Sequence, residues 1–371
     1  MAGIFKIVMK IKLDYPDDFH DYFSYRLVLI LTCDRLLRQD KEMREYSMLA
    51  ILVGLAIGIG LPMQTSINSR LRNSVGSPFG ASLISFAVGT LFLAIMTLID
   101  VHTLGFSTTL FTSQPVWIWL GGLLGVVYLT GNILLFPKLG SVQTVIMPVL
   151  GQILAGLLID NFGWFDSPQS TLTMTRFLGA ILVLAGVIIT VAAQGWLEQR
   201  HNRITETAEK DTATDTDTDT DQSGLGIWRA LGVVAGMLSA MQTAVNGHLG
   251  RVLGSTVHAA FVSFLVGTLG LIVIVLVLRP QFKLIRPTKT PNPWWMWIGG
   301  MIGALYVLGN VYLVPVVGTG LAVVIVLVGL MAGSLMIDQF GWFASKKNPI
   351  SGVQLMGLLV MIVGVVLIRV F

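Results

Sequence analysis

Long apolar segments separated by short polar connections run along most of the chain. Ten segments approach the ~20 apolar residues that a helix needs to cross a bilayer. They lie at approximately 48–67, 78–100, 116–136, 142–160, 175–196, 227–245, 256–278, 294–314, 320–338 and 352–371. Short connections favour packing between sequence neighbours, and glycines within the segments favour close approach of helices. The pattern predicts an all-α membrane protein with ten transmembrane helices.

The last five segments repeat the first five at one constant offset, so that Met63 corresponds to Met241 and Asp160 to Asp338. MQTSIN at 63–68 matches MQTAVN at 241–246, and IDNFGWF at 159–165 matches IDQFGWF at 337–343. Apolar periodicity alone does not produce matched Asn, Gln, Tyr, Trp and Asp residues. The sequence therefore predicts a duplicated and fused five-helix unit.

The basic residues predict how the two units are oriented. If each unit crosses the membrane five times, the second unit enters from the opposite side. Thirteen of the sixteen basic residues beyond residue 46 then fall on one side of the membrane. The positive-inside bias makes that side cytoplasmic. We therefore expect two inverted five-helix repeats joined by a cytoplasmic linker.

Two stretches lie outside the repeat. Residues 198–226 include the acidic run DTATDTDTDTD at 211–221, which cannot bury an apolar face and predicts a disordered linker. Residues 1–46 carry sixteen of the charged side chains. We expect that translation starts at Met43 or Met48, with a genuine N-terminal tail as the alternative. The two repeats then occupy 47–197 and 227–371.

The composition excludes several classes of protein. The chain is 54% hydrophobic and only 12% charged, with a mean hydropathy of +0.77, which excludes an ordinary cytosolic enzyme and a disordered chain. The net charge of +4 does not indicate nucleic-acid binding, because the basic residues are scattered between apolar segments. The single cysteine, Cys33, excludes an intramolecular disulfide and a cysteine metal cluster.

Four motifs, each present in both halves, carry a resemblance to a known family. They are MQTxxN, SFxxGT, GGxxGxxYxxGN and IDxFGWF, and the likeness covers 48–196 and 227–371. Each half resembles the small five-helix membrane proteins of the YdcZ family, within the drug/metabolite transporter superfamily. The resemblance implies a ten-helix transporter fold in a bacterial cytoplasmic membrane and, through the superfamily, an outward direction of transport. It supplies no substrate.

Polar groups within the apolar helices are the candidates for solute recognition. Asn132 and Asn310 match in the repeat, and Tyr128 and Tyr306 precede them by four residues on the same helix face. An asparagine amide both donates and accepts hydrogen bonds. Two interpretations stay equally open: contact with a solute, or hydrogen bonding between helices.

Glutamines complete the set of candidates. Gln64 and Gln242 lie deeper in their segments than Asn68 and Asn246, for which helix capping is at least as good an explanation. Gln152 has Leu330 as its counterpart, so it breaks the symmetry of the repeat. The expected substrate-binding residues are Asn132, Asn310, Tyr128, Tyr306, Gln64, Gln242 and Gln152.

The only acids matched between the halves are Asp160 and Asp338. Both lie in the last turn of their segments, beside the tryptophans of the FGWF motif, which favours a structural role at the membrane interface over proton coupling. No charged residue falls at the middle of a segment. We therefore expect a neutral or zwitterionic ligand, or a modest cation held by aromatic faces.

These observations predict a secondary transporter of a small organic solute, an exporter that works by alternating access. The alternative is a non-transporting membrane scaffold, and an intramembrane enzyme or a channel is less favoured. Enzyme motifs such as HExxH, GxSxG and the P-loop are missing from the sequence, so we expect neither catalysis nor a cofactor or metal. The expected partners are the solute and membrane lipid, with no nucleic acid. The oligomeric state stays open, a homo-oligomer included.

Overall fold

The computed structural model describes residues 48–209, 222–279, 292–344 and 349–370, which excludes the predicted tail at 1–46. Side chains are described for these residues except at 130, 132–134, 136–145, 192–209, 222–225, 344 and 369–370. Every regular element in this part of the chain is helical. The helices are Met48–Val75, α3 (Pro78–Val101), α4 (Leu110–Ser113), α5 (Gly121–Phe162), α6 (Met174–Glu209), α7 (Gln222–Leu253), α8 (Thr256–Leu278), α9 (Gly299–Val317), α10 (Thr319–Phe340) and α11 (Gly352–Val370).

Stretches within six of these helices are long and apolar enough to cross a bilayer. Two shorter apolar stretches, Ile146–Phe162 and Gly352–Ile368, accompany them. The six spans are Met48–Val75, Pro78–Val101, Met174–Val191, Thr256–Leu278, Gly299–Val317 and Thr319–Phe340. The prediction of an all-helical protein is confirmed for the described residues. The number of ten membrane spans stays a prediction.

Equivalent helices of the two halves start with the same local chemistry. Ser77 caps α3 by accepting a hydrogen bond from the amide of Gly80, and Ser255 caps α8 by accepting one from the amide of His258, each at 3.2 Å. The two serines occupy equivalent positions of the repeat. A serine oxygen at this position satisfies a backbone N–H that the first helical turn leaves free.

The third and fourth predicted segments of each half fold back on each other. In the second half, Gly318 has φ +83° and separates α9 from α10. In the first half, the segments predicted at 116–136 and 142–160 both lie in the 42-residue helical run α5. This run is not straight, because Gln152 Nε2 lies 3.4 Å from the Tyr128 hydroxyl, whereas 24 residues of straight helix would span about 36 Å. Leu135 and Met147 also both lie beside Gly232 of α7, so α5 reverses direction between them, as the sequence predicts.

Helices also enter the predicted linker from both sides. α6 continues to Glu209 and α7 begins at Gln222, so both ends of the stretch 198–226 are helical. Extending an existing helix costs less than nucleating a new one, which explains how a polar sequence can continue α6. The residues between, 210–221, lie outside the described part of the chain.

Contacts between equivalent residues relate the two halves by a pseudo-two-fold axis. The rings of Phe86 and Phe264, which match in the repeat, stack with centroids 4.9 Å apart. The hydroxyl groups of Thr90 and Thr268, another matched pair, are 2.7 Å apart. Two copies of one unit bring a residue against its own counterpart only where a two-fold axis passes between them. The axis therefore runs between α3 and α8.

Glycines make this arrangement close-packed. A Cβ on Gly122 of α5 would collide with the backbone oxygen of Ser263, and one on Gly300 of α9 with that of Ser85. These two contacts are the same contact seen from each half. Small residues at such crossings let helix backbones approach closely, which is the usual source of packing energy between membrane helices.

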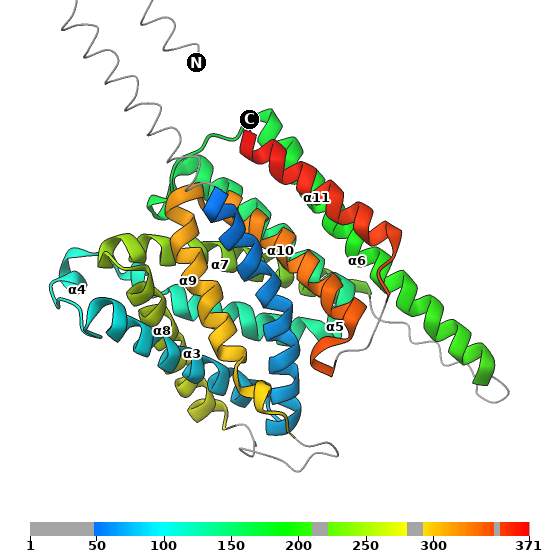
Figure 1. Cartoon of the computed structure of the whole chain (residues 1–371), viewed down its shortest axis with the longest axis horizontal. Helices are drawn as coiled ribbons and strands as arrows, with labels where there is room; N and C mark the ends of the chain where they lie inside the picture. Colours follow the sequence, from blue (N-terminus) through cyan, green and yellow to red (C-terminus); the bar gives the residue numbers. More distant parts are fainter. Residues whose placement is uncertain (1–47, 210–221, 280–291, 345–348, 371) are drawn as a thin grey trace, which may run out of the picture. The chain divides into compact units, whose positions relative to one another are not determined.

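The last helix of each half pairs with its counterpart. Figure 1 shows α6 and α11 side by side, and their crossing is reciprocal. A Cβ on Gly179 would lie 2.7 Å from the oxygen of Gly364, and one on Gly186 would lie 2.5 Å from that of Gly357. The repeated glycines of the fifth and tenth predicted segments therefore mark one helix–helix contact.

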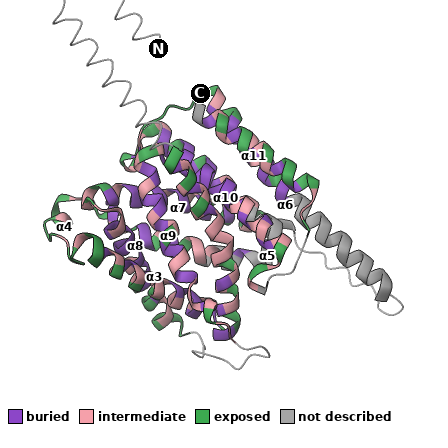
Figure 2. Ribbon diagram, in the orientation of Figure 1, coloured by how far each residue is buried: buried purple, intermediate pink, exposed green. Residues whose placement is uncertain are grey.

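Burial separates an inner helix from apolar outer faces. Figure 2 shows α10 as largely buried, in agreement with fifteen buried residues among its 22. Large apolar side chains are exposed along α3, α8 and α11, for example Leu91, Val277 and Leu359. Exposed apolar surface of this extent is typical of helices that face lipid.

Candidate functional site

A group of polar side chains gathers between α5 and α7. The Nε2 atom of Gln152 lies 3.0 Å from the Ser239 hydroxyl and 3.4 Å from the Tyr128 hydroxyl. Gln152 is 8% exposed and Ser239 is 3% exposed, so the interaction is shielded from solvent. Two residues predicted for the site, Tyr128 and Gln152, are therefore in contact, and Ser239 is an addition that sequence reasoning missed.

A second group lies where α9 meets α7. The side chains of Asn310 and Thr243 lie close to the Tyr306 hydroxyl, and Tyr128 is nearby. Asn310 Nδ2 in addition donates to the backbone oxygen of Tyr306 at 3.0 Å. Ser239 and Thr243 are one helical turn apart on α7 and so connect the two groups. We call the combined set the central polar cluster; its members are Tyr128, Gln152, Ser239, Thr243, Tyr306 and Asn310.

The predicted glutamines flank this cluster in a reciprocal way. Gln242 lies over Gly125 of α5, where an added Cβ would be 2.6 Å from its Nε2 atom. Gln64 lies over Gly303 of α9, where an added Cβ would meet its amide in the same way. Each of these glycines is three residues before a tyrosine of the cluster. The glycines therefore make room for a glutamine amide beside each tyrosine.

Asn132 is the one predicted site residue whose side chain lies outside the described residues. Its backbone belongs to α5. Its counterpart Asn310 is 3% exposed and already makes the backbone hydrogen bond given above. The expectation that the two asparagines act as a pair stays a prediction.

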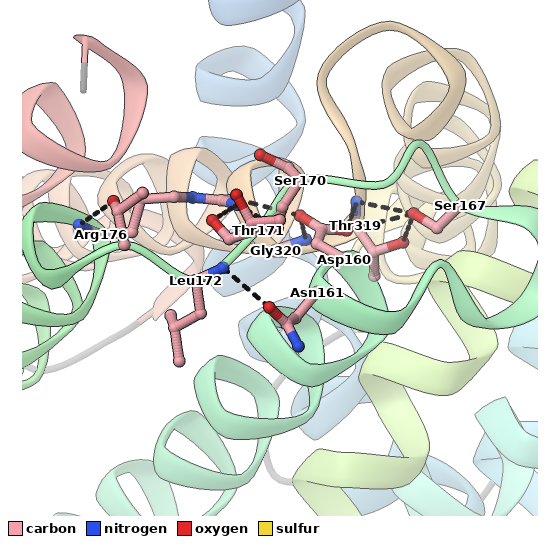
Figure 3. A network of polar contacts seen from close by, with 10 residues as sticks. Asp160, Asn161, Ser167, Ser170, Thr171, Leu172, Arg176, Thr319 and Gly320 are labelled. Atoms are coloured by element: carbon pink, nitrogen blue, oxygen red, sulfur yellow. Dashed lines mark hydrogen bonds and ion pairs between the residues drawn. The ribbon is translucent and has the colours of Figure 1, made fainter.

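Asp160, in the last turn of α5, is wholly buried and forms a separate network (Figure 3). Its carboxylate accepts hydrogen bonds from the amides of Thr319 at 2.8 Å and Gly320 at 2.9 Å, and from the Ser167 hydroxyl at 3.1 Å. Arg176 Nη2 lies 3.5 Å from Oδ2, the oxygen that also accepts from Gly320. The two amides belong to the first turn of α10, so a carboxylate of the first repeat caps a helix of the second.

Both terminal nitrogens of the Arg176 guanidinium have polar partners. Its Nη1 atom donates to the backbone oxygen of Ser170 at 2.6 Å, and its side chain is 7% exposed. A negative charge is favourable at the positive end of a helix dipole, and a buried carboxylate needs several donors to offset its lost hydration. The network therefore gives Asp160 a structural role, tying α5, α6 and α10 together.

An open pocket of about 640 Å³ lies next to this network, beyond the predicted membrane span of α7. Within it, His248 Nδ1 lies 3.0 Å from the Asp166 carboxylate, and the imidazole packs 4.9 Å from the Trp117 ring. Burial lowers the pKa of His248, and the Asp166 carboxylate opposes that shift while Arg251 adds to it. The pocket does not include any residue of the central polar cluster.

The described residues contain no group of three or more His, Cys, Asp or Glu side chains arranged to hold a metal ion. Within the central polar cluster, the available chemistry is hydrogen bonding by amide and hydroxyl groups and contact with two aromatic rings. Such groups can bind and orient a solute.

Comparison with known proteins identifies the fold unit. A family model described as "Putative inner membrane exporter, YdcZ" matches residues 49–189 and again 227–367. The chain is 28% identical to the inner membrane protein YdcZ of Escherichia coli (strain K12) over 144 residues, which are 39% of this chain and 94% of that protein. A solved structure described as "Crystal structure of protein" is similar in fold, with a TM-score of 0.57, 14% identity, and coverage of 86% of this chain and 94% of the other.

The two family matches fall one in each half and agree with the offset of the repeat, since position 49 corresponds to 227 and 189 to 367. Together they cover most of the chain. Multiple apolar helices accompany them. The chain is therefore a tandem-duplicated member of the YdcZ family, a multi-pass protein of the bacterial inner membrane.

Proposed function

We propose that the chain is a secondary transporter that exports a small organic solute by alternating access. The observation that carries the proposal is the central polar cluster, enclosed by two halves related by a pseudo-two-fold axis. Transporters of this kind often bind their substrate between repeats and open the site to each side in turn. The family description, an inner membrane exporter, supports the direction.

The proposal includes ten membrane spans in two inverted five-helix repeats. Under this topology the 198–226 linker is cytoplasmic, and Asp160 lies at the outer face while Asp338 lies at the cytoplasmic face. The network around Asp160 then holds the outer side of the two repeats together. The lipid-facing apolar surfaces of α3, α8 and α11 agree with helices embedded in the bilayer.

Alternating access requires contacts between the repeats that can open and close. The first turn of α10 follows Gly318 and is capped by Asp160 of the first repeat. Release of this outer contact would open the site to that side. The coupling ion is not part of this proposal.

Export is tested by comparing intracellular and extracellular metabolites in cells that express the wild type or the Asn132→Leu/Asn310→Leu double variant. The two proteins are matched for abundance in the membrane. A solute that redistributes with the wild type and not with the variant supports transport and assigns the asparagines to the site. Equal metabolite profiles in wild-type and empty-vector cells over a broad panel would favour the scaffold alternative.

A further inference from the structure

The central polar cluster is polar at one end and apolar at the other. Four of its six members have the same residue type at the equivalent position of the other half, and two do not. Gln152 has Leu330 as its counterpart, and Ser239 has Leu61. The matched pairs are Tyr128 with Tyr306, Thr243 with Thr65, and Asn310 with Asn132.

The two unmatched members are bonded to each other. Gln152 donates to Ser239 at 3.0 Å and so forms one polar end, joined to Tyr128. At the equivalent place in the other half, the backbone of Leu330 lies against Gly58 of the Met48–Val75 helix, one turn before Leu61. Leu61 packs in the same apolar cluster as Tyr306.

The cluster also lacks charge. Its six members, Tyr128, Gln152, Ser239, Thr243, Tyr306 and Asn310, are all uncharged residue types. Moving an ion into a weakly polar interior is costly unless an opposite charge meets it there. A neutral hydrogen-bonding group can replace the Gln152–Ser239 hydrogen bond without that cost, and an apolar group can cover the leucines.

We infer that the site takes an amphipathic solute without net charge, its hydrogen-bonding head against Gln152, Ser239 and Tyr128 and its apolar end toward Leu61 and Leu330. The inference rests on the proposed function, because it assigns a substrate class to the same site. It also gives the fused chain a property that two identical units could not have: both repeats contribute to each end of the site, but equivalent positions are polar at one end and apolar at the other.

The test uses binding by calorimetry to the purified full-length protein in detergent. The probes are acetamide, phenylacetamide and 4-phenylbutanamide, with phenylacetate and 2-phenylethylamine as charged analogues. We expect affinity to rise from acetamide to the phenyl amides, and phenylacetamide to bind at least tenfold more tightly than either ion. The inference is overturned if an ion binds as tightly as phenylacetamide, or if no amide binds.

Variants separate recognition from folding. Gln152→Leu should lower phenylacetamide affinity roughly tenfold, because the amide loses its partner. Gln152→Glu should shift the preference to 2-phenylethylamine, a change that a purely structural glutamine would not produce. Gln354→Leu is the matched control, since Gln354 is also a buried glutamine, 3% exposed, but its amide bonds Ser351 at the start of α11. It should leave the affinity for phenylacetamide unchanged.

The proposed function fails separately from this inference. If the phenyl amides bind as expected but do not cross proteoliposome membranes that contain the protein, the site assignment stands and transport is contradicted. If a solute redistributes in cells while every neutral amide fails to bind, transport stands and the substrate class is wrong.

Discussion

Removing the Asp160 carboxylate should destabilise the protein far more than removing an exposed aspartate. Asp160→Ala takes an acceptor from two backbone amides of α10, from Ser167 and from Arg176. Losing one partner of a buried ion pair costs about 3–5 kcal/mol, because the remaining charge stays buried without compensation. Arg176 keeps its hydrogen bond to the backbone oxygen of Ser170, which places the expected loss near about 3 kcal/mol.

The variant Arg176→Gln should cost less, about 1–2 kcal/mol, because the carboxylate keeps its three other donors. The position equivalent to Arg176 in the second half is Gln354, so glutamine is a side chain that this fold already accepts there. The double variant Asp160→Ala/Arg176→Gln should be less destabilised than the sum of the two single variants, because the second change removes the uncompensated charge.

The assay is reversible unfolding of the purified protein in mixed micelles, followed by circular dichroism, with the free energy of unfolding compared between variants. Asp100→Ala is the control, since Asp100 is exposed and accepts a single hydrogen bond from Ser255 at 2.9 Å. It should change the free energy by less than about 1 kcal/mol. If Asp160→Ala is no more destabilising than Asp100→Ala, the role assigned to the network is wrong.

Three further predictions concern the helix break, the pocket and the two-fold contact. Gly318→Ala should destabilise the protein by more than about 1 kcal/mol in the same unfolding assay, because φ is +83° and a Cβ would lie 2.9 Å from the Asp160 carboxylate. Gly352→Ala is the control and should be neutral, since Gly352 has open space around it. The pKa of His248 in the folded protein is lowered from the ordinary value of 6.5, so the stability that this residue contributes is present above pH 6.5 and is lost as the pH falls through the pKa of the folded state. The thermal midpoint of His248→Gln should therefore depend less on pH between about 8 and 5 than that of the wild type. In a cysteine-free background, Thr90→Cys/Thr268→Cys should form an intramolecular disulfide on mild oxidation, detected after protease cleavage of the linker as two halves that separate only under reduction.

Much of the fold could be predicted because duplication left matched polar residues in apolar helices. The constant offset that aligns Gln64 with Gln242 also relates Phe86 to Phe264, which stack in the structure. The cap that Asp160 gives to α10 could not be predicted, because it is a long-range contact that no local pattern encodes.

The site was only partly accessible from sequence. Tyr128 and Gln152 are in contact as neighbouring members of one cluster, and Gln152 stood out because its counterpart is leucine. Ser239 escaped notice because a lone serine in a membrane helix commonly serves helix packing. The signal that could have found it is the same as for Gln152: a polar residue whose counterpart, Leu61, is apolar.

Membrane topology tests the central claim, because alternating access by this mechanism requires the repeats to be inverted. Single cysteines at Gln169 and at its counterpart Lys347 would be probed with a membrane-impermeant maleimide in intact cells and after permeabilisation, in a cysteine-free background. The account predicts that Gln169→Cys is labelled in intact cells and Lys347→Cys only after permeabilisation. Labelling of both cysteines from the same side would contradict inverted repeats and the alternating-access mechanism built on them.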